Sequence, residues 1–349
     1  MFSGSYNSDD VEFLLKPIEI PYTSVEEKEQ RLQSGIHYSE MLSYEGKPSQ
    51  EYEKFFQQSI QRNGGLLAYH VQQMAKMVLQ SKPKPVIVSI ARAGTPIGVL
   101  LKQAIKLENF NAKHFSISLL RGRGVDTNAL TYIAANFDSK DVIFVDGWCG
   151  KGGIYRELIR SVKTFNATHG TQFSTNMYVV SDPLGITDTY VTREDYLIPN
   201  AVLNSTVSGL VSRTILNREY VGPNDYHGCV VFDELKDVDR SMSFVKDISR
   251  NFIDHAQVEH PTSTTPNVSF NSVFNRLPTE FSTRSPHLIK PGVGEATRSL
   301  LRRQTELMFV ENMDDDHIQH LIFLAKSKNV PIRILETSPY KVICVVTKN

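Results

Sequence analysis

The sequence predicts an α/β fold, with a parallel sheet flanked by helices and a second, smaller α/β domain at the C-terminal end. Short apolar runs such as 86–91 (VIVSIA) and 141–145 (DVIFV) are each followed by apolar residues at helical spacing, an alternation typical of a parallel sheet. A stretch at 261–286 that is rich in Ser, Thr, Pro and Asn then separates this region from a second alternation of strands and helices.

Each element is predicted from its own periodicity. Residues 1–48 are expected to form an irregular arm, because their short apolar runs alternate with acidic residues without a regular period. Apolar residues at helical spacing between 49 and 78 predict two packed helices, separated by Gly64 and Gly65. The other predicted elements are strands at 86–91, 114–120, 141–145 and 177–182, helices at 95–107 and 154–165, and, near the C-terminus, helices at 295–303 and 314–328 with strands at 307–312, 330–335 and 341–346.

These elements divide the chain into four parts. We expect an N-terminal arm at 1–48, a large α/β domain at 49–262, a linker at 263–290 and a small domain at 291–349. The last part has about 60 residues, which is near the lower limit for independent folding.

Composition sets the general class of the protein. Of 349 residues, 40% are hydrophobic and 22% charged, a globular composition without a run long enough to span a membrane. No export signal is recognised at the start, and three cysteines far apart do not suggest a disulfide framework, so we expect a cytoplasmic protein with no membrane partner. The net charge of zero leaves nucleic-acid binding to local basic patches, and the chain could form a homo-oligomer.

The segment 144–153 (FVDGWCGKGG) connects a predicted strand to a predicted helix. Its glycines let the backbone turn tightly and direct amides inward at a helix N-terminus, which predicts an anion site. Asp146, before the turn, is placed to accept hydrogen bonds from sugar hydroxyls. The alternative is an ordinary glycine-rich connection. The predicted anion-binding residues are Gly150, Lys151, Gly152 and Gly153.

Two further loops follow predicted strands. The segment 121–126 (RGRGVD) places Arg121 and Arg123 on a glycine-flanked loop, at the position where phosphoribosyltransferases, which this region resembles, carry a catalytic loop. The alternative is a solvated basic loop. The segment 89–96 (SIARAGTP) opens a helix and resembles the diphosphate-binding loop of phosphoribosyltransferases. This resemblance implies Arg92, Ala93, Gly94 and Thr95 as its ligands.

Together the loops resemble those of type I phosphoribosyltransferases, whose signature has an apolar strand, two acids, two variable residues, two hydroxyl residues and a glycine. Asp146 matches the first acid and Gly152 the glycine. Gly147 replaces the second acid, while Gly150 and Lys151 replace the hydroxyl pair.

The resemblance implies an enzyme that transfers or cleaves ribose phosphate at a base, with phosphoribosyl diphosphate as substrate. Mg²⁺ would bridge diphosphate and ribose oxygens without a cage of protein ligands. The implied roles are ribose contact for Asp146, diphosphate binding for Arg92 and the backbone of 93–95, neutralisation of the leaving group for Arg121 or Arg123, and 5′-phosphate binding for 150–153.

With 208–217 (SGLVSRTILN) and 222–228 (GPNDYHG), the loops also resemble bacterial phosphoribosyltransferase-like proteins of tellurite-resistance stress gene clusters, some of which are labelled a cysteine protease family, StiP. A protease using Cys149 is therefore an alternative, because the helix N-terminus and Lys151 could lower the pKa of its thiol. That family usually has threonine at this position. The candidate bases are His169, His227, His255 and His260.

The segment 292–303 (GVGEATRSLLRR) resembles the start of ribosomal L7Ae/Pelota-type RNA-binding domains. Gly294 stands where that pattern has asparagine. The resemblance implies contact with structured RNA, and a third alternative is a nucleotide-binding or RNA-binding protein without catalysis. The residues that match the pattern are Gly292, Glu295, Thr297 and Arg298.

Overall fold

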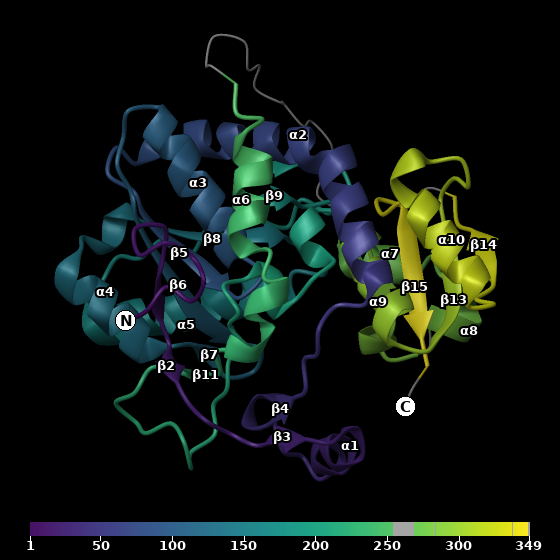
Figure 1. Cartoon of the computed structure of the whole chain (residues 1–349), viewed down its shortest axis with the longest axis horizontal. Coiled ribbons are helices and arrows are strands. Elements are labelled where there is room, and N and C mark those ends of the chain that lie inside the picture. The colour runs from purple at the N-terminus through teal and green to yellow at the C-terminus, as the bar shows by residue number, and fades with distance from the viewer. Residues whose placement is uncertain (254–268, 283, 337, 348–349) are drawn as a thin grey trace.

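The computed structural model describes residues 1–253, 269–282, 284–336 and 338–347 (Figure 1). A parallel sheet lies at its centre, with strand order β1-β6-β5-β8-β9-β10 and the short β7 antiparallel to β6. The strands are β1 Glu12–Leu14, β5 Val86–Ala91, β6 Lys113–Leu120, β7 Gly124–Val125, β8 Val142–Trp148, β9 Met177–Ser181 and β10 Tyr190–Thr192.

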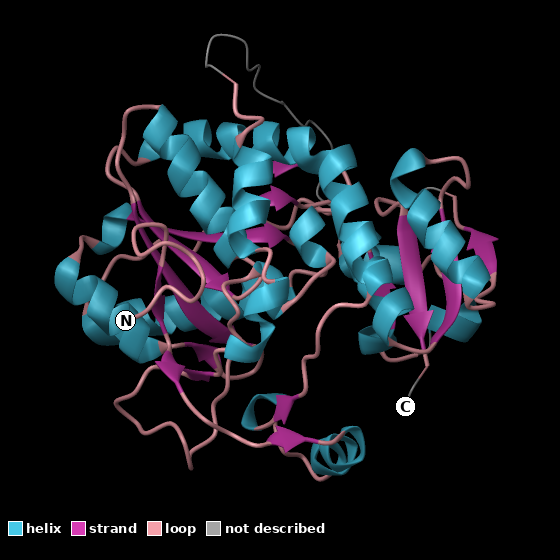
Figure 2. Cartoon of the chain, viewed as in Figure 1, coloured by secondary structure: helices cyan, strands magenta, loops and turns pink. Residues whose placement is uncertain are grey.

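Helices cover both faces of this sheet (Figure 2). One face carries α2 Gln50–Ser81, α3 Thr95–Leu107 and α6 Ser241–Ser249, and the other carries α4 Thr127–Asn136 and α5 Gly153–His169. Shorter elements complete this part: α1 Val25–Gln33, β2 Lys16–Pro17, β3 Tyr22–Thr23, β4 Leu42–Ser43, β11 Gly228–Cys229, and the 3₁₀ turns η1 Tyr38–Glu40, η2 Ser139–Asp141, η3 Pro199–Ala201, η4 Ser205–Val207 and η5 Asp233–Val238.

The C-terminal domain has a four-stranded sheet of its own, in the order β12-β15-β13-β14. Helices α9 and α10 cover one face and α7 and α8 the other. The predicted fold class is therefore confirmed. The bounds are α7 Phe270–Phe274, α8 Thr279–Ser282, η7 Pro286–Leu288, β12 Ile289–Pro291, α9 Val293–Arg302, β13 Thr305–Val310, η8 Asp316–Ile318, α10 Gln319–Ser327, β14 Ile332–Ile334 and β15 Val342–Val346.

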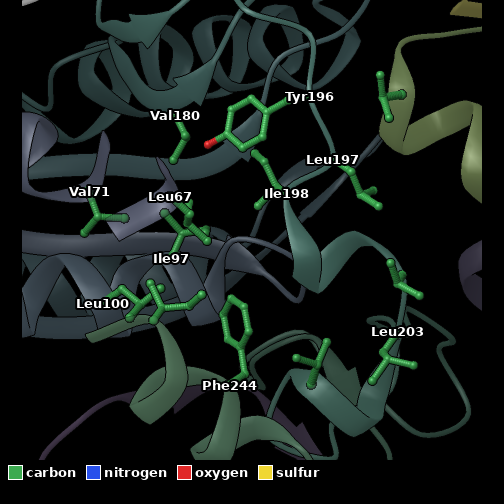
Figure 3. Packing of buried hydrophobic residues seen from close by; sticks show 14 of the residues in the cluster. Leu67, Val71, Ile97, Leu100, Val180, Tyr196, Leu197, Ile198, Leu203 and Phe244 are labelled. Carbon is green, nitrogen blue, oxygen red and sulfur yellow. The ribbon is translucent and has the colours of Figure 1, made fainter. Parts of the chain in front are cut away.

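The core on the α2 face is built from apolar side chains at helical spacing (Figure 3). Leu67 and Val71 of α2 pack with Ile97 of α3 and Phe244 of α6, and none of the four is exposed. The same cluster continues into α9 and α10, so the two domains share a hydrophobic core. Burial of this apolar surface is the main stabilising contribution.

A single helix replaces the two helices predicted between 49 and 78. Helix α2 runs through Gly64 and Gly65, starting after Ser49, whose side chain accepts a hydrogen bond from the Tyr52 N–H. A Cβ on Gly64 would lie 3.4 Å from Cδ1 of Ile248, so the glycine permits close packing against α6. Each interior glycine costs about 1 kcal/mol of helix propensity, which the buried face of a long helix offsets.

Two segments differ from the predicted arm and linker. Strand β1, within the predicted arm 1–48, pairs with β6 and forms the edge of the central sheet. The predicted linker 263–290 lies partly outside the described residues, and its described part forms α7 and α8 and the start of β12. Local composition misleads here because Val273 and Phe281 bury their side chains against the C-terminal sheet.

Candidate active site

A cavity of about 420 Å³ lies at the carboxyl ends of the parallel strands, where α/β proteins commonly bind ligands. Loops after β5, β6 and β8 form one side of the cavity. Residues of β12 and α9 form the other, so that the cavity lies between the two domains. It brings together loops that the sequence separates by about 50 residues and joins them to the C-terminal domain.

The loop between β8 and α5 forms the floor of the cavity. The Cys149 N–H donates to the Ser181 carbonyl at 2.9 Å, which continues the strand pairing past Trp148. Gly152 then has a φ of 71°, a left-handed conformation that suits glycine, and α5 begins at Gly153. The first N–H groups of α5 therefore lie at the cavity and have no hydrogen-bond partners within the helix.

Cys149 lines this cavity but is only 3% exposed. Burial raises the pKa of its thiol, the carboxylates of Asp182 and Asp146 raise it further, and a hydrogen bond from the Gly152 N–H opposes them. The predicted lowering of this pKa is therefore wrong. Lys151 does not reverse it, because its ammonium group donates to the carbonyls of Pro286 and Ile289, both at 2.9 Å.

Asp146 also lines the cavity, and its carboxylate accepts a hydrogen bond from the Gly147 N–H at 2.8 Å. Burial raises the pKa of Asp146 from 3.8 to about 6, against lowering by that hydrogen bond and by Arg298. This side chain can thus gain or lose a proton close to neutral pH.

The predicted anion loop 89–96 is only partly at the cavity. Ala93 lines it, and so does Arg92, whose guanidinium pairs with Glu45 at 2.7 Å and donates to the Val211 carbonyl at 3.0 Å. Gly94 is packed against strand carbonyls, where a Cβ would lie 2.9 Å from the oxygen of Ile90. Thr95 is fully buried and hydrogen-bonds the Ser116 hydroxyl at 2.7 Å.

The structure separates the two arginines of the loop 121–126. Arg121 lines the cavity, and its Nη2 lies 3.0 Å from where a Cβ on Gly153 would be, so its guanidinium covers the start of α5. Arg123 instead pairs with Glu40 and does not line the cavity. Only Arg121 is therefore placed to act on a bound molecule.

The four predicted RNA-binding residues lie at or beside the domain interface. Glu295 and Arg298 line the cavity, and Arg298 donates through Nε to the Ala201 carbonyl at 3.0 Å. Gly292 packs against the indole ring of Trp148. Thr297 is buried, donating to the Val293 carbonyl at 2.7 Å, and therefore has a structural position.

Asp195 is an important residue that sequence reasoning missed. Its buried carboxylate accepts hydrogen bonds from the backbone N–H of Val293 at 2.9 Å and of Lys341 at 3.0 Å. The first of these caps α9, since Gly292 has no side chain to do so. No local motif reveals a cap that comes from a residue about 100 positions earlier in the chain.

Asp195 should make stability depend on pH. Burial raises its pKa from 3.8 to about 7, so between about pH 4 and 7 the folded protein holds a proton that the unfolded chain has released. The free energy of unfolding therefore falls as pH rises through this window, by up to about 1.4 kcal/mol per pH unit for each such group. Urea unfolding should show a shallower pH slope for Asp195→Asn. Asp188→Asn, at an exposed position, is the control, and a slope unchanged in both variants would contradict the assignment.

The described histidines among the predicted bases lie away from Cys149. His169 stacks on Phe165, and His227 bonds the Ser118 hydroxyl at 2.8 Å. His255 and His260 lie outside the described residues. No histidine is among the cavity-lining residues of the described chain, and nowhere in that part do three or more His, Cys, Asp or Glu side chains gather in a way that could hold a metal ion.

Comparison with known proteins identifies the class. Residues 4–249 match the family model described as tellurite-like stress resistance cysteine protease StiP, and residues 269–348 match the PELOTA RNA binding domain. The chain is also 34% identical over 364 aligned positions to "Cysteine protease StiP" of Acinetobacter baylyi (strain ATCC 33305 / BD413 / ADP1), with 99% of this chain and 94% of the relative covered. The chain belongs to the StiP family.

Solved phosphoribosyltransferase structures are much more distant. A hypoxanthine-guanine-xanthine phosphoribosyltransferase has a TM-score of 0.26 at 10% identity, covering 38% of this chain and 77% of its own. A structure described as an analysis of an invariant aspartic acid in HPRTs, asparagine mutant, also has a TM-score of 0.26, at 12% identity, covering 36% of this chain and 73% of its own. Similarity at this level carries no argument about activity.

The predicted phosphoribosyltransferase activity is therefore wrong, because the family model and the curated relative both name a cysteine protease. Phosphoribosyl diphosphate as a partner has no support from these comparisons. The Mg²⁺ expected with that substrate stays a prediction. Among the described residues, no helix has the length and apolar character needed to cross a membrane.

Proposed function

We propose that this protein is a cysteine protease whose nucleophile is Cys149. One observation carries the proposal: of the three cysteines, Cys149 alone lines the cavity between the domains. Cys229 and Cys344 are fully buried in the hydrophobic core. The family name and the name of the curated relative support the same activity.

The chemistry needs a base, because the resting thiol is protonated at neutral pH. Asp146 lines the same cavity and is mostly a carboxylate above about pH 6, so it is the proposed acceptor of the thiol proton. The thiolate attacks the scissile carbonyl carbon and forms a thioester as the amine leaves with a proton from Asp146. Water then hydrolyses the thioester and restores the thiol.

The N-terminus of α5 supplies the other requirement, which is stabilisation of the negative oxygen that forms during attack. The Gly152 N–H lowers the pKa of the Cys149 thiol, and the first N–H groups of α5 follow it in the chain without helical partners. Backbone N–H groups directed at a developing oxyanion typically contribute a factor of about 10²–10³ each.

The first test is cleavage of a defined mixture of unfolded polypeptides, with products identified by mass spectrometry. Iodoacetamide should stop the cleavage and leave its adduct on Cys149. Labelling should be slow at pH 7 and faster at higher pH, since the raised pKa keeps the thiol protonated. An absence of products, or undiminished cleavage by protein that is fully alkylated at Cys149, would overturn the proposal.

The pH profile tests the base. Cleavage should increase as pH rises through about 6, because Asp146 must lose its proton to act. Asp146→Asn should remove this step in the profile and slow cleavage by about 10²–10⁴-fold. Asp188→Asn should preserve both rate and profile. A step near pH 6 that persists in Asp146→Asn would assign it to another group.

We further propose that the C-terminal domain binds RNA, as its match to the PELOTA RNA binding domain supports. Glu295 and Arg298 line the cavity, so RNA that contacts them must approach the cleft between the domains. Filter binding of a bulged RNA hairpin should weaken as salt rises from 50 to 200 mM and should weaken again in Arg298→Ala. Lys106→Gln, at an exposed site on α3, is the control. Binding that ignores both salt and Arg298 would contradict this site.

A further inference from the structure

We propose that the mouth of the cavity is an anion-binding subsite, built by both domains, that selects peptide substrates with an acidic residue beside the scissile bond. The inference rests on the proposed protease function, and it names the substrate class. Three cations form this subsite, and we call them the mouth cluster: Arg121, Lys151 and Lys290.

The mouth cluster comes from three separate segments. Arg121 follows β6 and covers the start of α5, while Lys151 belongs to the loop before α5, two positions from Cys149. Lys290 lies on β12 of the C-terminal domain. The subsite is thus incomplete without the C-terminal domain, and it lies next to the proposed nucleophile.

Two of the three cations in the mouth cluster, Arg121 and Lys290, are not balanced by a partner among the described residues. Neither the guanidinium of Arg121 nor the ammonium of Lys290 makes a hydrogen bond or an ion pair of 4.0 Å or less with the residues that the structure describes. The remaining cavity-lining arginines are different: Arg92 pairs with Glu45 at 2.7 Å, and Arg298 pairs with Glu295 at 3.5 Å.

The lowered pKa values of Lys151 and His287 support an excess of positive charge at the mouth cluster. Burial, Lys290 and Arg121 together lower the pKa of Lys151 to about 8, while Glu295 opposes them. The pKa of His287, at the edge of the mouth cluster, is lowered by burial and then by Lys151, Arg121 and Lys290. Cations that repel one another in this way are stabilised by a bound anion.

A carboxylate of the substrate is the anion that fits the proposed reaction. Arg121, Lys151 and Lys290 line the same cavity as Cys149, so a carboxylate held by them belongs to a residue close to the bond under attack. Arg121 and Lys290, on opposite sides of the cavity mouth, then hold the carboxylate from both domains. Charge-assisted hydrogen bonds of this kind are stronger than neutral ones, which gives discrimination between Glu and Gln.

The test is binding of matched peptides to the Cys149→Ala protein, in which cleavage cannot interfere. Peptides that differ only in Glu or Gln beside the cleaved bond should differ in affinity by at least about tenfold at low salt. The double variant Arg121→Gln/Lys290→Gln should reduce the difference to less than about twofold. Lys106→Gln should retain the difference in affinity between the two peptides. Lys290→Arg, in a protein that keeps Arg121, should also show this difference, because the positive charge is preserved.

Three outcomes separate this inference from the proposed function. Equal affinity for the Glu and Gln peptides overturns the acidic-residue inference, even where wild-type protein cleaves both. Preferential binding of the Glu peptide without cleavage by wild-type protein supports the subsite and overturns the protease proposal. Tight binding of inorganic pyrophosphate with no preference between the peptides shows that the mouth cluster takes small phosphates and also overturns the inference.

Discussion

Replacing Cys149 with alanine should lower the cleavage rate at saturating substrate by at least about 1,000-fold, because no other described cysteine lines the cavity. Loss of a nucleophile commonly has effects of this size or larger. The thermal stability should change little compared with the activity, since a single small side chain is lost. The measurement is kcat on a peptide identified in the cleavage screen, together with a melting curve.

The other two cysteines provide matched controls. Cys229→Ala and Cys344→Ala remove buried sulfur atoms from the core and should reduce stability by about 1 kcal/mol while leaving kcat within a few-fold. Cleavage that survives Cys149→Ala but fails in folded Cys229→Ala protein would place the nucleophile elsewhere.

Gly292→Ala should disrupt the docking of the C-terminal domain. Gly292 has a φ of 86°, and an added Cβ would lie 2.5 Å from Cζ2 of Trp148 and 3.2 Å from Oδ1 of Asp195. Its ψ is 153°, a combination with positive φ that is essentially restricted to glycine and costs alanine about 1–3 kcal/mol, and the overlap with a packed ring adds about 1–3 kcal/mol. Cleavage should fall as well, because β12 and α9 would no longer line the cavity.

Gly35 is a control with a matching φ angle. Its φ is also 86°, but nothing lies within 4 Å of the position of an added Cβ. Gly35→Ala should therefore show only the conformational cost, and cleavage should be unchanged. Unfolding free energies and small-angle scattering measure the difference. Equal losses of stability in the two variants would show that contact with Trp148 does not decide how the domains dock.

Prediction from sequence was most successful where the signal was local. The strand at 86–91 and the helix at 95–107 appear as β5 and α3 because their apolar periodicity directly reflects which side chains are buried. The glycines at 150–153 likewise marked a tight strand-to-helix turn, and Gly152 does take a left-handed conformation. Prediction failed for the linker, where apolar residues are too sparse to show that their partner is a distant sheet.

Motif spacing also placed Asp146, Cys149 and Lys151 at one edge of the sheet, and in the structure all three line one cavity there. Motif spacing could not show which charged groups surround these three side chains. The direction of the Cys149 pKa shift depends on burial and on Asp182, which approaches from the end of β9. Electrostatic effects depend on distance in space and local solvent access, and neither follows from spacing in the chain.

The sequence by itself determined the parallel α/β architecture, the small C-terminal domain and the loop that carries Cys149, because apolar periodicity and glycine placement are local properties of the chain. Only the tertiary structure decided that Asp195 caps α9, that Gly292 packs on Trp148, and that Lys290 faces the same cavity as Arg121. Each of these three arrangements involves residues about 100 or more positions apart in the chain. The packing of the shared hydrophobic core brings these residues together.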